Sequence, residues 1–451
     1  MIKRKAMLRL QSWKEESSGT TSLLIEGARR VGKSTLVEEF ARTHYKSHLI
    51  IDFTSAPKAI LNHFEDSRDD VDSFLSYLEA YYSVKFHRRD TLIVFDEVQH
   101  FPIARAFLKQ LVADGRYDYI ATGSLISIKR NVEGILIPSE EESFELNPLD
   151  YEEFLLALGH ETLVDILASS AKDMKSLPDL IHKKASKLFR EYIIVGGMPQ
   201  SVAEYIKSGD FAKVDKVKRR ILSLYRNDIA RYAQGYESKV VSIFEEIPSQ
   251  LSKKEKRFFL SSLGKDARMR SYEDAFFWLA DAKIANLCYN ATDPSVGLRL
   301  SKQHTTLKCF LLDTGLLVSQ AFDSNTSAAN TFHKDILLDR LEVNEGIFME
   351  NYVAQALHAM NYPLYFYSRS DRNNSENTME IDFLIVRADG PRLKVCPIEV
   401  KSGKSYVTKS LDKFRRKFSN RIGTDFILHT GNIAVEDKRV KLPLYLLNWL
   451  R

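Results

Sequence analysis

The stretch Thr21–Arg42, TSLLIEGARRVGKSTLVEEFAR, decides how the N-terminal third of the chain folds. It begins with a short apolar run, Leu23–Ile25, which is typical of a buried strand. Residues Ser34–Arg42 have the composition of a helix. Between them, the eight residues from Gly27 to Ser34 satisfy the spacing G-x-x-x-x-G-K-[ST]. The stretch therefore predicts a strand, a glycine-rich loop and a helix.

This loop has the residues needed to bind a nucleoside triphosphate. Glycines let backbone N–H groups surround phosphates without Cβ clashes, and the helix N-terminus adds positive potential. We expect Lys33 to reach the β- and γ-phosphates, Ser34 to coordinate Mg²⁺, and Thr35 to lie near the α-phosphate. A chance glycine-rich turn is the alternative, but the strand–loop–helix setting favours ATP with Mg²⁺. The predicted ATP-binding residues are Gly27, Ala28, Arg29, Arg30, Val31, Gly32, Lys33, Ser34 and Thr35.

A second segment, Thr91–Pro102 (TLIVFDEVQHFP), supplies the predicted metal partner and base. Its continuous apolar run fits a strand buried on both faces of a parallel sheet. Because ligands bind at the carboxyl ends of such strands, Asp96 falls where Mg²⁺ would be held. Glu97 follows at once and is the predicted general base for the attacking water. An Asp-Glu pair also suits the start of a helix, but the glycine-rich loop favours the metal role.

Further strands are predicted on both sides of this one. Leu49–Phe53 reads as a strand, and so does Tyr117–Leu125, which ends in Thr122, Gly123 and Ser124. A polar residue there could sense the γ-phosphate, or it could belong to a plain Thr/Ser turn; the sequence favours neither. Several strands with helical stretches between them predict an α/β fold with a parallel sheet.

The bulk composition excludes several classes of protein. The 451 residues carry a net charge of +5, which permits a nucleic-acid partner without requiring one. The three cysteines are scattered, so neither a disulfide framework nor a zinc site is expected. No window reaches 18 consecutive apolar residues, and the basic N-terminus has no apolar run behind it. We therefore expect a cytoplasmic protein with no membrane partner.

Several motifs together resemble a bacterial and archaeal family of AAA-type P-loop ATPases. They are GARRVGKST, VFDEVQ, ATGS, FELNPLDYEEFL (Phe144–Leu155) and YIIVGGMPQSV (Tyr192–Val202). The resemblance implies ATP hydrolysis and a helical lid after the ATPase core. Similar Gly-x-Pro elements in related ATPases line the adenine site, so Gly197 and Pro199 are candidates for that role. An ordinary turn between helices would explain both residues equally well.

The resemblance also implies an arginine that completes hydrolysis, often supplied by a neighbouring subunit. The sequence does not choose among its arginines, and the candidates are Arg29, Arg30, Arg130, Arg226 and Arg231. A homo-oligomer is therefore a hypothesis that the sequence leaves open.

The middle of the chain offers two segments for contact with DNA. Lys213–Tyr232 carries seven basic residues against two acidic ones, which fits a nucleic-acid face or, as we favour, a solvated amphipathic helix. Further on, Ser271–Ala291 and the D-x-GLL element at Asp313–Leu317 resemble the winged-helix-like segment of the same family. Winged helices bind DNA or serve as protein contacts, so both partners stay open.

Near the C-terminus, PIEVKSG (Pro397–Gly403) places Glu399 and Lys401 on one face of a short strand. A lone E-x-K pair is usually a same-face ion pair. Here, however, Asp382 precedes it on another predicted strand and Glu350 lies on a predicted helix. The set resembles the family's C-terminal domain of unknown function, which looks like a PD-(D/E)xK restriction-endonuclease core.

That resemblance implies a second divalent metal, held by Glu350, Asp382 and Glu399. Carboxylate oxygens suit a hard cation, which would polarise a phosphodiester, while Lys401 would orient the nucleophile or stabilise charge. Ile381 stands where the family pattern has proline. Such cores often lose catalysis while keeping DNA contact, so cleavage is a separate hypothesis. Between Lys401 and Arg421 there are eight basic residues and one acidic residue, which fits a phosphate backbone.

The predicted architecture is therefore a P-loop AAA-type ATPase core (1–160), a helical lid (161–235), a winged-helix-like segment (236–330) and a restriction-endonuclease-like α/β domain (335–451). Three functions are compatible with it. They are an ATPase acting on DNA, a nucleotide-switched signalling or scaffold ATPase with an inactive C-terminal domain, and a nucleotide-dependent toxin or defence component.

Overall fold

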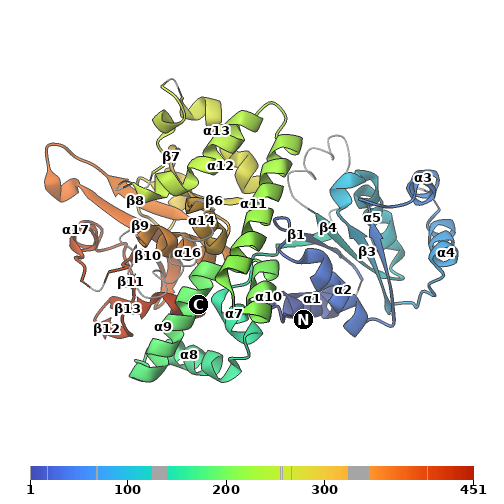
Figure 1. Cartoon of the computed structure of the whole chain (residues 1–451), viewed down its shortest axis with the longest axis horizontal. Helices are drawn as coiled ribbons and strands as arrows, with labels where there is room; N and C mark the ends of the chain where they lie inside the picture. The colour runs from blue at the N-terminus through green and yellow to red at the C-terminus, as the bar shows by residue number, and fades with distance from the viewer. Residues whose placement is uncertain are drawn as a thin grey trace. The chain divides into compact units, whose positions relative to one another are not determined.

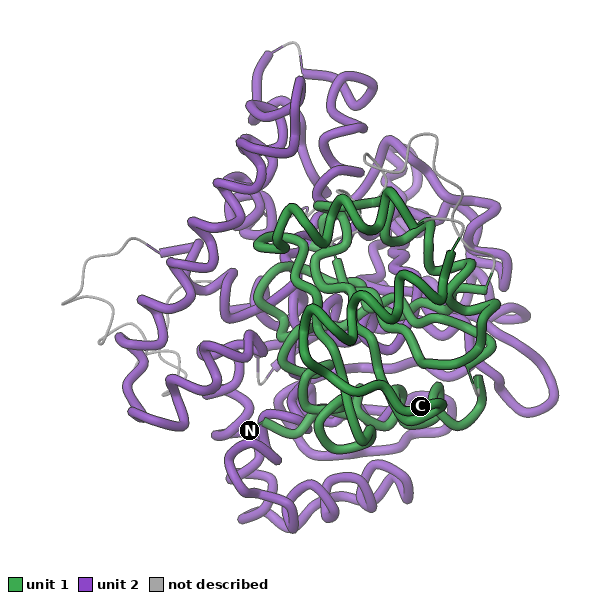
Figure 2. Tube along the Cα trace, turned by 90° about the vertical axis from the view of Figure 1, so that its right-hand side faces the viewer, with its two compact units in different colours: residues 1–147, 281–283 green, residues 148–280, 284–451 purple. Residues whose placement is uncertain are grey.

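The structure is a computed structural model of the chain, and it describes residues 2–450 except positions 18, 68, 69, 124–139, 254, 256, 266, 323–344 and 404. The chain divides into two compact units (Figure 2). Unit 1 comprises residues 1–147 with 281–283, and unit 2 comprises 148–280 with 284–451. The finer division into four domains stays a prediction.

Unit 1 is a parallel five-stranded sheet with helices, which confirms the α/β class predicted for the N-terminal part. The strand order is β2-β3-β4-β1-β5, and every neighbouring pair is parallel. Its elements are α1 (Ala6–Ser17), β1 (Ser22–Glu26), α2 (Lys33–His44), β2 (Ser47–Asp52), α3 (Lys58–Asp66), α4 (Val71–Tyr82), β3 (Thr91–Asp96), α5 (Pro102–Asp114), β4 (Asp118–Gly123) and β5 (Glu141–Glu145).

The two central strands of this sheet are buried along their whole length. Every residue of β3 and of β4 is buried, as expected for strands that are covered on both faces. Phe64 and Phe74, from α3 and α4, pack edge to face with Phe95 of β3 and Phe107 of α5. This aromatic packing holds the carboxyl end of β3, where Asp96 lies, in a fixed position.

Unit 2 begins with a series of helices. They are α7 (Tyr151–Ala157), α8 (Glu161–Asp173), α9 (Asp179–Val195), α10 (Pro199–Ser208), α11 (Phe211–Tyr232), α12 (Glu237–Ser252), α13 (Met269–Asp281), α14 (Thr314–Ala321) and, after the gap, α16 (Gly346–Ala359). α7 starts with a capping box, because Asp150 accepts from the Glu153 N–H while Glu153 accepts from the Asp150 N–H. Helices thus cover most of residues 161–235, which agrees with the helical character predicted for that segment.

The second sheet has eight strands in the order β12-β13-β11-β10-β9-β8-β6-β7. Its strands are β6 (Ala285–Ala291), β7 (Lys302–Leu311), β8 (Tyr365–Arg369), β9 (Met379–Asp389), β10 (Arg392–Val400), β11 (Asp425–His429), β12 (Ala434–Glu436) and β13 (Arg439–Pro443). The helix α17 (Lys409–Lys417) packs on β9, and α16 packs against β6, β7 and β10 (Figure 1).

One sheet therefore joins two segments that the sequence places in different domains. The hairpin β6–β7 comes from the predicted winged-helix-like segment, yet β6 pairs in parallel with β8 through Tyr289 with Tyr365 and Asn290 with Phe366. The Asn290 side chain strengthens this junction, because its carbonyl oxygen accepts from the Ser368 N–H at 2.9 Å. As a result, side chains from β7 and β9 lie in the same unit and on the same sheet.

Candidate functional site

The glycine-rich loop of unit 1 connects β1 to α2 in a conformation that its glycines make accessible. Gly27 and Gly32 have φ of 149° and 95°, values in the range that favours glycine. A Cβ on Gly27 would lie 2.5 Å from the carbonyl oxygen of Leu146. Arg30 adopts φ of 70° and is exposed. The first position of the motif therefore admits no side chain, and the loop closes tightly on the chain after β5.

Lys33 is the first residue of α2 and is buried, with 5% of its surface exposed. Its ammonium group donates to the carbonyl oxygens of Gly27 at 3.0 Å and Ala28 at 3.2 Å. Burial lowers its pKa, although the carboxylates of Glu97 and Asp96 act in the opposite direction. Arg4, which no motif singles out, donates to the Val31 carbonyl at 3.0 Å and fixes the outer side of the loop.

Asp96 ends β3 beside the loop, as the sequence predicts. Its carboxylate accepts hydrogen bonds from the hydroxyl groups of Ser34 and Thr122, and burial raises its pKa. Ser34 belongs to α2 and Thr122 to β4, so three elements meet at this carboxylate. Oxygen ligands from Ser34 and Asp96 thus converge where the sequence predicts Mg²⁺, and these residues fit that ion.

Glu97 follows Asp96 in an unusual backbone conformation. Its φ of 52° lies in the left-handed region, which a non-glycine residue adopts at a cost of about 1–2 kcal/mol. Its N–H donates to the Thr122 hydroxyl at 3.3 Å, and the Gln99 side chain donates to its carboxylate. The strained turn and these two contacts hold the predicted base in a defined place beside Asp96.

The structure bears on one of the two interpretations of the end of the third strand, the plain Thr/Ser turn. Thr122 is not in a turn: it lies within β4, is fully buried, and bridges Asp96 and Glu97. Sequence reasoning named Thr122 but missed this bridging role, because the pairing of β3 with β4 brings the two segments together. Ser124 and Arg130 lie outside the described residues. The γ-phosphate role of Thr122 stays a prediction.

In unit 2, the predicted nuclease-like residues lie close together. The antiparallel ladder of β9 and β10 reaches Phe383 with Ile398, so Asp382 and Glu399 follow directly on the two strands. Asp382 accepts from the Val400 N–H at 2.8 Å. Glu350, on α16, is 4% exposed and acts electrostatically on Lys401. The structure thus brings together the four residues of the predicted set.

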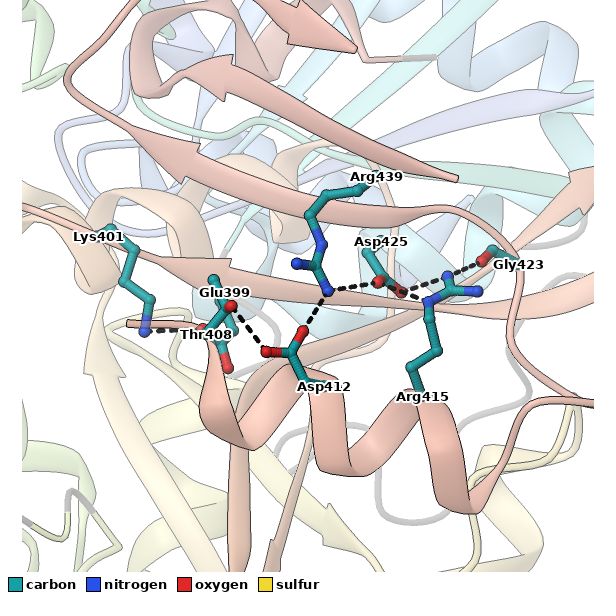
Figure 3. A network of polar contacts seen from close by, with 8 residues as sticks. All are labelled: Glu399, Lys401, Thr408, Asp412, Arg415, Gly423, Asp425 and Arg439. Carbon is teal, nitrogen blue, oxygen red and sulfur yellow. Dashed lines mark hydrogen bonds and ion pairs between the residues drawn. The ribbon is translucent and has the colours of Figure 1, made fainter. Parts of the chain in front are cut away.

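Glu399 is buried and pairs with Lys401 at 2.7 Å (Figure 3). Burial raises the pKa of Glu399 to about 6, and the nearby Lys401 limits the rise. Burial also lowers the pKa of Lys401, but Glu399 and Asp382 outweigh it, so this pKa lies above its ordinary value. Both the metal-binding and the ion-pair interpretations place these two side chains together.

Two further charged residues belong to this group, which we call the carboxylate cluster. Glu380 shares the face of Asp382 on β9, and its carboxylate pairs with Lys308 of β7 at 2.8 Å. The carboxylate cluster consists of Lys308, Glu350, Glu380, Asp382, Glu399 and Lys401. Sequence reasoning missed Lys308, because no motif marks it and it precedes Asp382 by more than seventy residues. Within the part of the chain that the structure describes, no three His, Cys, Asp or Glu side chains are grouped to hold a metal.

Comparison with known proteins agrees with the geometry of unit 1. Residues 20–155 match the family model of an AAA domain. Unit 1 has an AAA-type P-loop fold. Residues 186–327 match a domain of unknown function (DUF8612), and residues 345–447 match another (DUF4143). No curated protein matches the chain.

Several solved structures resemble the chain at low similarity. The Aeropyrum pernix Orc1 protein in complex with DNA has 13% identity and a TM-score of 0.27, over 75% of this chain and 94% of that one. Cdc6p from Pyrobaculum aerophilum has 13% identity and a TM-score of 0.27, over 76% and 97%. PCH-2 of C. elegans has 14% identity and a TM-score of 0.26, over 46% and 63%. Similarity at this level shows neither a shared substrate nor a shared partner.

Outside the AAA domain, Gly197 and Pro199 lie in a closely packed turn of unit 2. A Cβ on Gly197 would lie 2.0 Å from the Leu149 carbonyl oxygen, and the Gly197 N–H donates to Asp313 at 2.6 Å. Pro199 is the first residue of α10, a position that suits proline because the N–H there needs no partner. Packing thus accounts for both residues, and their role at adenine stays a prediction.

Asp313 belongs to the D-x-GLL element and joins it to the Gly-Gly-x-Pro turn. It is fully buried and also accepts from the Leu316 N–H at 2.9 Å. The equally buried Lys218 of α11 donates to the carbonyl oxygens of Ile194 at 2.6 Å and Gly315 at 3.1 Å. The two quoted motifs therefore meet at one buried junction, which consists of Lys218, Asp313 and the backbone of Ile194, Gly197, Gly315 and Leu316.

The two basic segments are less available than their sequences suggest. On α11, Lys218 is buried, Arg219 pairs with Asp215 at 2.7 Å, and Arg226 pairs with Glu245 at 2.6 Å. α11 is a helix with one buried side, as the favoured amphipathic interpretation predicts, but Lys218 lies on that side, and a nucleic-acid role for the other cations stays a prediction. Periodicity places these side chains on a helix, but it does not show which of them face the neighbouring helices.

Most of the cationic side chains in the segment Lys401–Arg421 form ion pairs within unit 2. Arg415 and Arg439 surround the buried Asp425, and Arg439 also pairs with Asp412 (Figure 3). Other ion pairs join Lys413 and Arg416 to Glu376, and Arg421 to Asp293. The count of eight bases against one acid therefore overstates the charge that this segment offers to a phosphate backbone, because the compensating acids come from distant segments.

Proposed function

We propose that unit 1 binds ATP with Mg²⁺ and hydrolyses it. The observation that carries this proposal is the meeting of Ser34, Asp96 and Thr122 beside the loop that holds Lys33. Three segments far apart in sequence supply one buried carboxylate, two hydroxyl groups and one ammonium group. A structural turn would not require this combination, whereas a triphosphate with its metal does.

Each residue has a defined role in this proposal. Lys33 leaves the loop carbonyls to bind the β- and γ-phosphates, whose charge replaces its contacts with Gly27 and Ala28. Ser34 and Asp96 hold Mg²⁺, which neutralises charge developing on the phosphates. Glu97 accepts the proton of the attacking water, and Gln99 orients its carboxylate. Arg29 and Arg30 lie exposed on the loop and are the candidates that could reach a ligand from this unit.

The test is steady-state ATP hydrolysis together with ATP retention. The Glu97→Gln variant keeps the size of the side chain but loses its basicity, so it should bind ATP and hydrolyse it at least about 100-fold more slowly. A filter or gel-filtration assay should recover ATP, not ADP, from this variant. Turnover of Glu97→Gln at the wild-type rate would remove Glu97 from the role of base.

Contact with DNA through unit 2 is a second candidate function, and one observation favours a particular surface. Arg270 lies in the first turn of α13, Lys265 and Arg268 lie just before that helix, and all three are exposed. Within the described parts of the chain, their side chains form no hydrogen bond or ion pair, unlike the paired cations near α17. Such cations are free to bind phosphates.

A matched pair of variants tests this surface. The double variant Arg268→Ala with Arg270→Ala should weaken binding to a DNA duplex and reduce the salt slope of log K by about 2, one for each lost phosphate contact. Arg416→Ala, which removes an exposed arginine already paired with Glu376, should leave the slope unchanged. Equal effects of the two changes, or no binding by the wild type, would contradict the proposal.

The same assay separates this function from the alternative predicted from the sequence. If DNA neither binds to the protein nor stimulates ATP hydrolysis, the result favours a nucleotide-switched signalling or scaffold ATPase with a partner-binding C-terminal region. The AAA domain and its ATPase site serve either function. An arginine supplied by a second copy of the chain would make hydrolysis depend on protein concentration, which the same ATPase assay measures.

A further inference from the structure

Lys308 occupies a position that is unusual for a lysine. It lies on β7 opposite Cys288 of β6, and its side chain is 1% exposed. Transfer of an ammonium group from water into a protein interior is strongly unfavourable unless opposite charges surround it. The contacts of Lys308 therefore show which opposite charges stabilise it in this part of the sheet.

Three carboxylates supply the compensation. Glu380 lies 2.8 Å from the Lys308 ammonium group, and Glu350 and Asp382 also act on it electrostatically. The ring of Phe366, on β8, has its centre 4.9 Å from the same nitrogen. Burial alone would lower the pKa of Lys308, but the carboxylates outweigh burial and raise it above the ordinary value. The 2.8 Å contact with Glu380 and the ring of Phe366 both suit a positively charged group.

The acids that surround Lys308 overlap with those predicted to hold a metal. Glu350 and Asp382 act on Lys308, while Glu399, the third predicted ligand, pairs with Lys401. Four carboxylates thus face two lysines. Lys401 belongs to the predicted metal site itself, whereas Lys308 comes from outside it, on β7. A metal ion would have to compete with the Lys308 ammonium group for these carboxylates, and among the described residues no three of them are grouped to hold one. The residues present do not fit a divalent metal ion.

We infer that the ammonium group of Lys308 takes the place of a divalent cation among Glu350, Glu380 and Asp382, so that the carboxylate cluster binds no metal and cleaves no phosphodiester. Its positive charge comes from β7, outside the segment that resembles a nuclease core. The ion pair between Lys308 and Glu380 thereby links the hairpin β6–β7 to β9, in the nuclease-like part of the sheet. This inference goes beyond the proposed ATPase and does not depend on it.

The first experiment measures Mn²⁺ binding to the full chain without nucleotide. Ser34→Ala and Asp96→Asn are introduced first, to remove the expected metal ligands of the AAA domain. Titration followed by electron paramagnetic resonance should then detect no stoichiometric Mn²⁺ site. One Mn²⁺ per chain that is lost on Asp382→Asn would overturn the inference, as would Mn²⁺-dependent cleavage of DNA that is lost on Glu399→Gln.

The second experiment removes the internal cation in the same background. Lys308→Met leaves the carboxylates without their buried partner, so the melting temperature should fall by on the order of 10 °C. Added Mn²⁺ should restore part of that loss in Lys308→Met and shift the parent protein little. Lys441→Met, which breaks an exposed pair with Glu436, is the control and should show neither effect.

Two outcomes of this second experiment would count against the inference. A melting temperature of Lys308→Met equal to that of the parent would show that the cluster does not need the ammonium group. An equal Mn²⁺ response in parent and variant would show that metal and lysine do not compete for one place. If Lys308→Met does not fold, the Mn²⁺ titration of the parent protein decides alone.

Discussion

In unit 1, we call Lys33, Ser34, Asp96, Glu97 and Thr122 the P-loop cluster. This cluster and the carboxylate cluster of unit 2 both lie at the ends of buried strands, but they are assembled differently. In unit 1, Lys33, Asp96 and Glu97 belong to motifs whose strands run parallel, so their ends meet at one edge of the sheet. In unit 2, Asp382 and Glu399 meet through a hairpin, while Lys308 reaches Glu380 from the far end of the same sheet.

This difference shows why a loop motif says more about function than a strand motif does. The glycine-rich loop has local geometry that suits phosphates wherever it occurs in a chain. A Glu-x-Lys strand, in contrast, takes its chemistry from the charges that the rest of the fold places around it. On our inference, the same four residues would suit a metal without Lys308 and suit an internal ion network with it.

The largest effect is expected when one lysine of each cluster is replaced and the ATP turnover of the two variants is compared. Lys33→Ala should reduce ATP turnover at least about 100-fold, because it removes the cation at the β- and γ-phosphates. Lys401→Ala, which removes the partner of Glu399, should leave ATP turnover within about twofold of the wild type. Steady-state hydrolysis by both variants is the measurement. A loss in Lys401→Ala as large as in Lys33→Ala would contradict the division of roles.

The buried junction at Asp313 should have the next largest effect, on stability. Asp313→Ala removes the acceptor of the Gly197 and Leu316 N–H groups and one of the charges near buried Lys218, so unfolding should become easier by about 3–5 kcal/mol. Urea unfolding of the full chain measures the change. Asp173→Ala, at the exposed end of α8, is the control and should stay within about 0.5 kcal/mol.

Variants of Thr122 distinguish an effect on hydrolysis, through Asp96 and Glu97, from an effect on nucleotide binding. Thr122→Val keeps the shape of the side chain but removes the hydroxyl that bridges Asp96 and Glu97, so kcat should fall by about 10–100-fold with little change in KM for ATP. Thr122→Ser keeps the hydroxyl and should restore most of the turnover. Wild-type turnover in Thr122→Val would show that the bridge is not needed.

The smallest predicted effect is a pH dependence that originates at Lys218. Burial lowers the pKa of Lys218 to about 8, despite the nearby carboxylates of Asp215 and Asp313. Between about pH 8 and the ordinary lysine value, the unfolded chain therefore binds more protons than the folded one. The contribution of Lys218 to the free energy of unfolding should rise with pH there, by at most about 1.4 kcal/mol per unit.

Comparison of two variants isolates this contribution. Urea unfolding between pH 7.5 and 10 should show a steeper rise for the wild type than for Lys218→Met. Lys187→Met, which removes an exposed lysine of α9, should follow the wild type. Parallel curves for all three proteins would mean that Lys218 titrates near its ordinary pKa.

Within the described residues, no helix is both long and apolar enough to cross a membrane. The structure tests some of the remaining sequence-based expectations and leaves others untested. The strands carrying Asp96, Asp382 and Glu399 and the helix carrying Glu350 form where their patterns predict. The arginine that would complete hydrolysis, and the number of subunits, are not decided by the contacts within one chain.

The amino-acid sequence by itself determined the local elements of both clusters. Glycine spacing, a doubly buried apolar run and a hairpin pattern each depend on residues close together in the chain, so Gly27, Asp96 and Asp382 could be placed without a structure. Only the tertiary structure decided which charges meet. Thr122 joins Asp96 through the pairing of β3 with β4, Lys308 reaches Glu380 across a shared sheet, and Arg415 is neutralised by Asp425. Electrostatic interactions depend on distance in space, and a linear pattern of charges does not contain those distances.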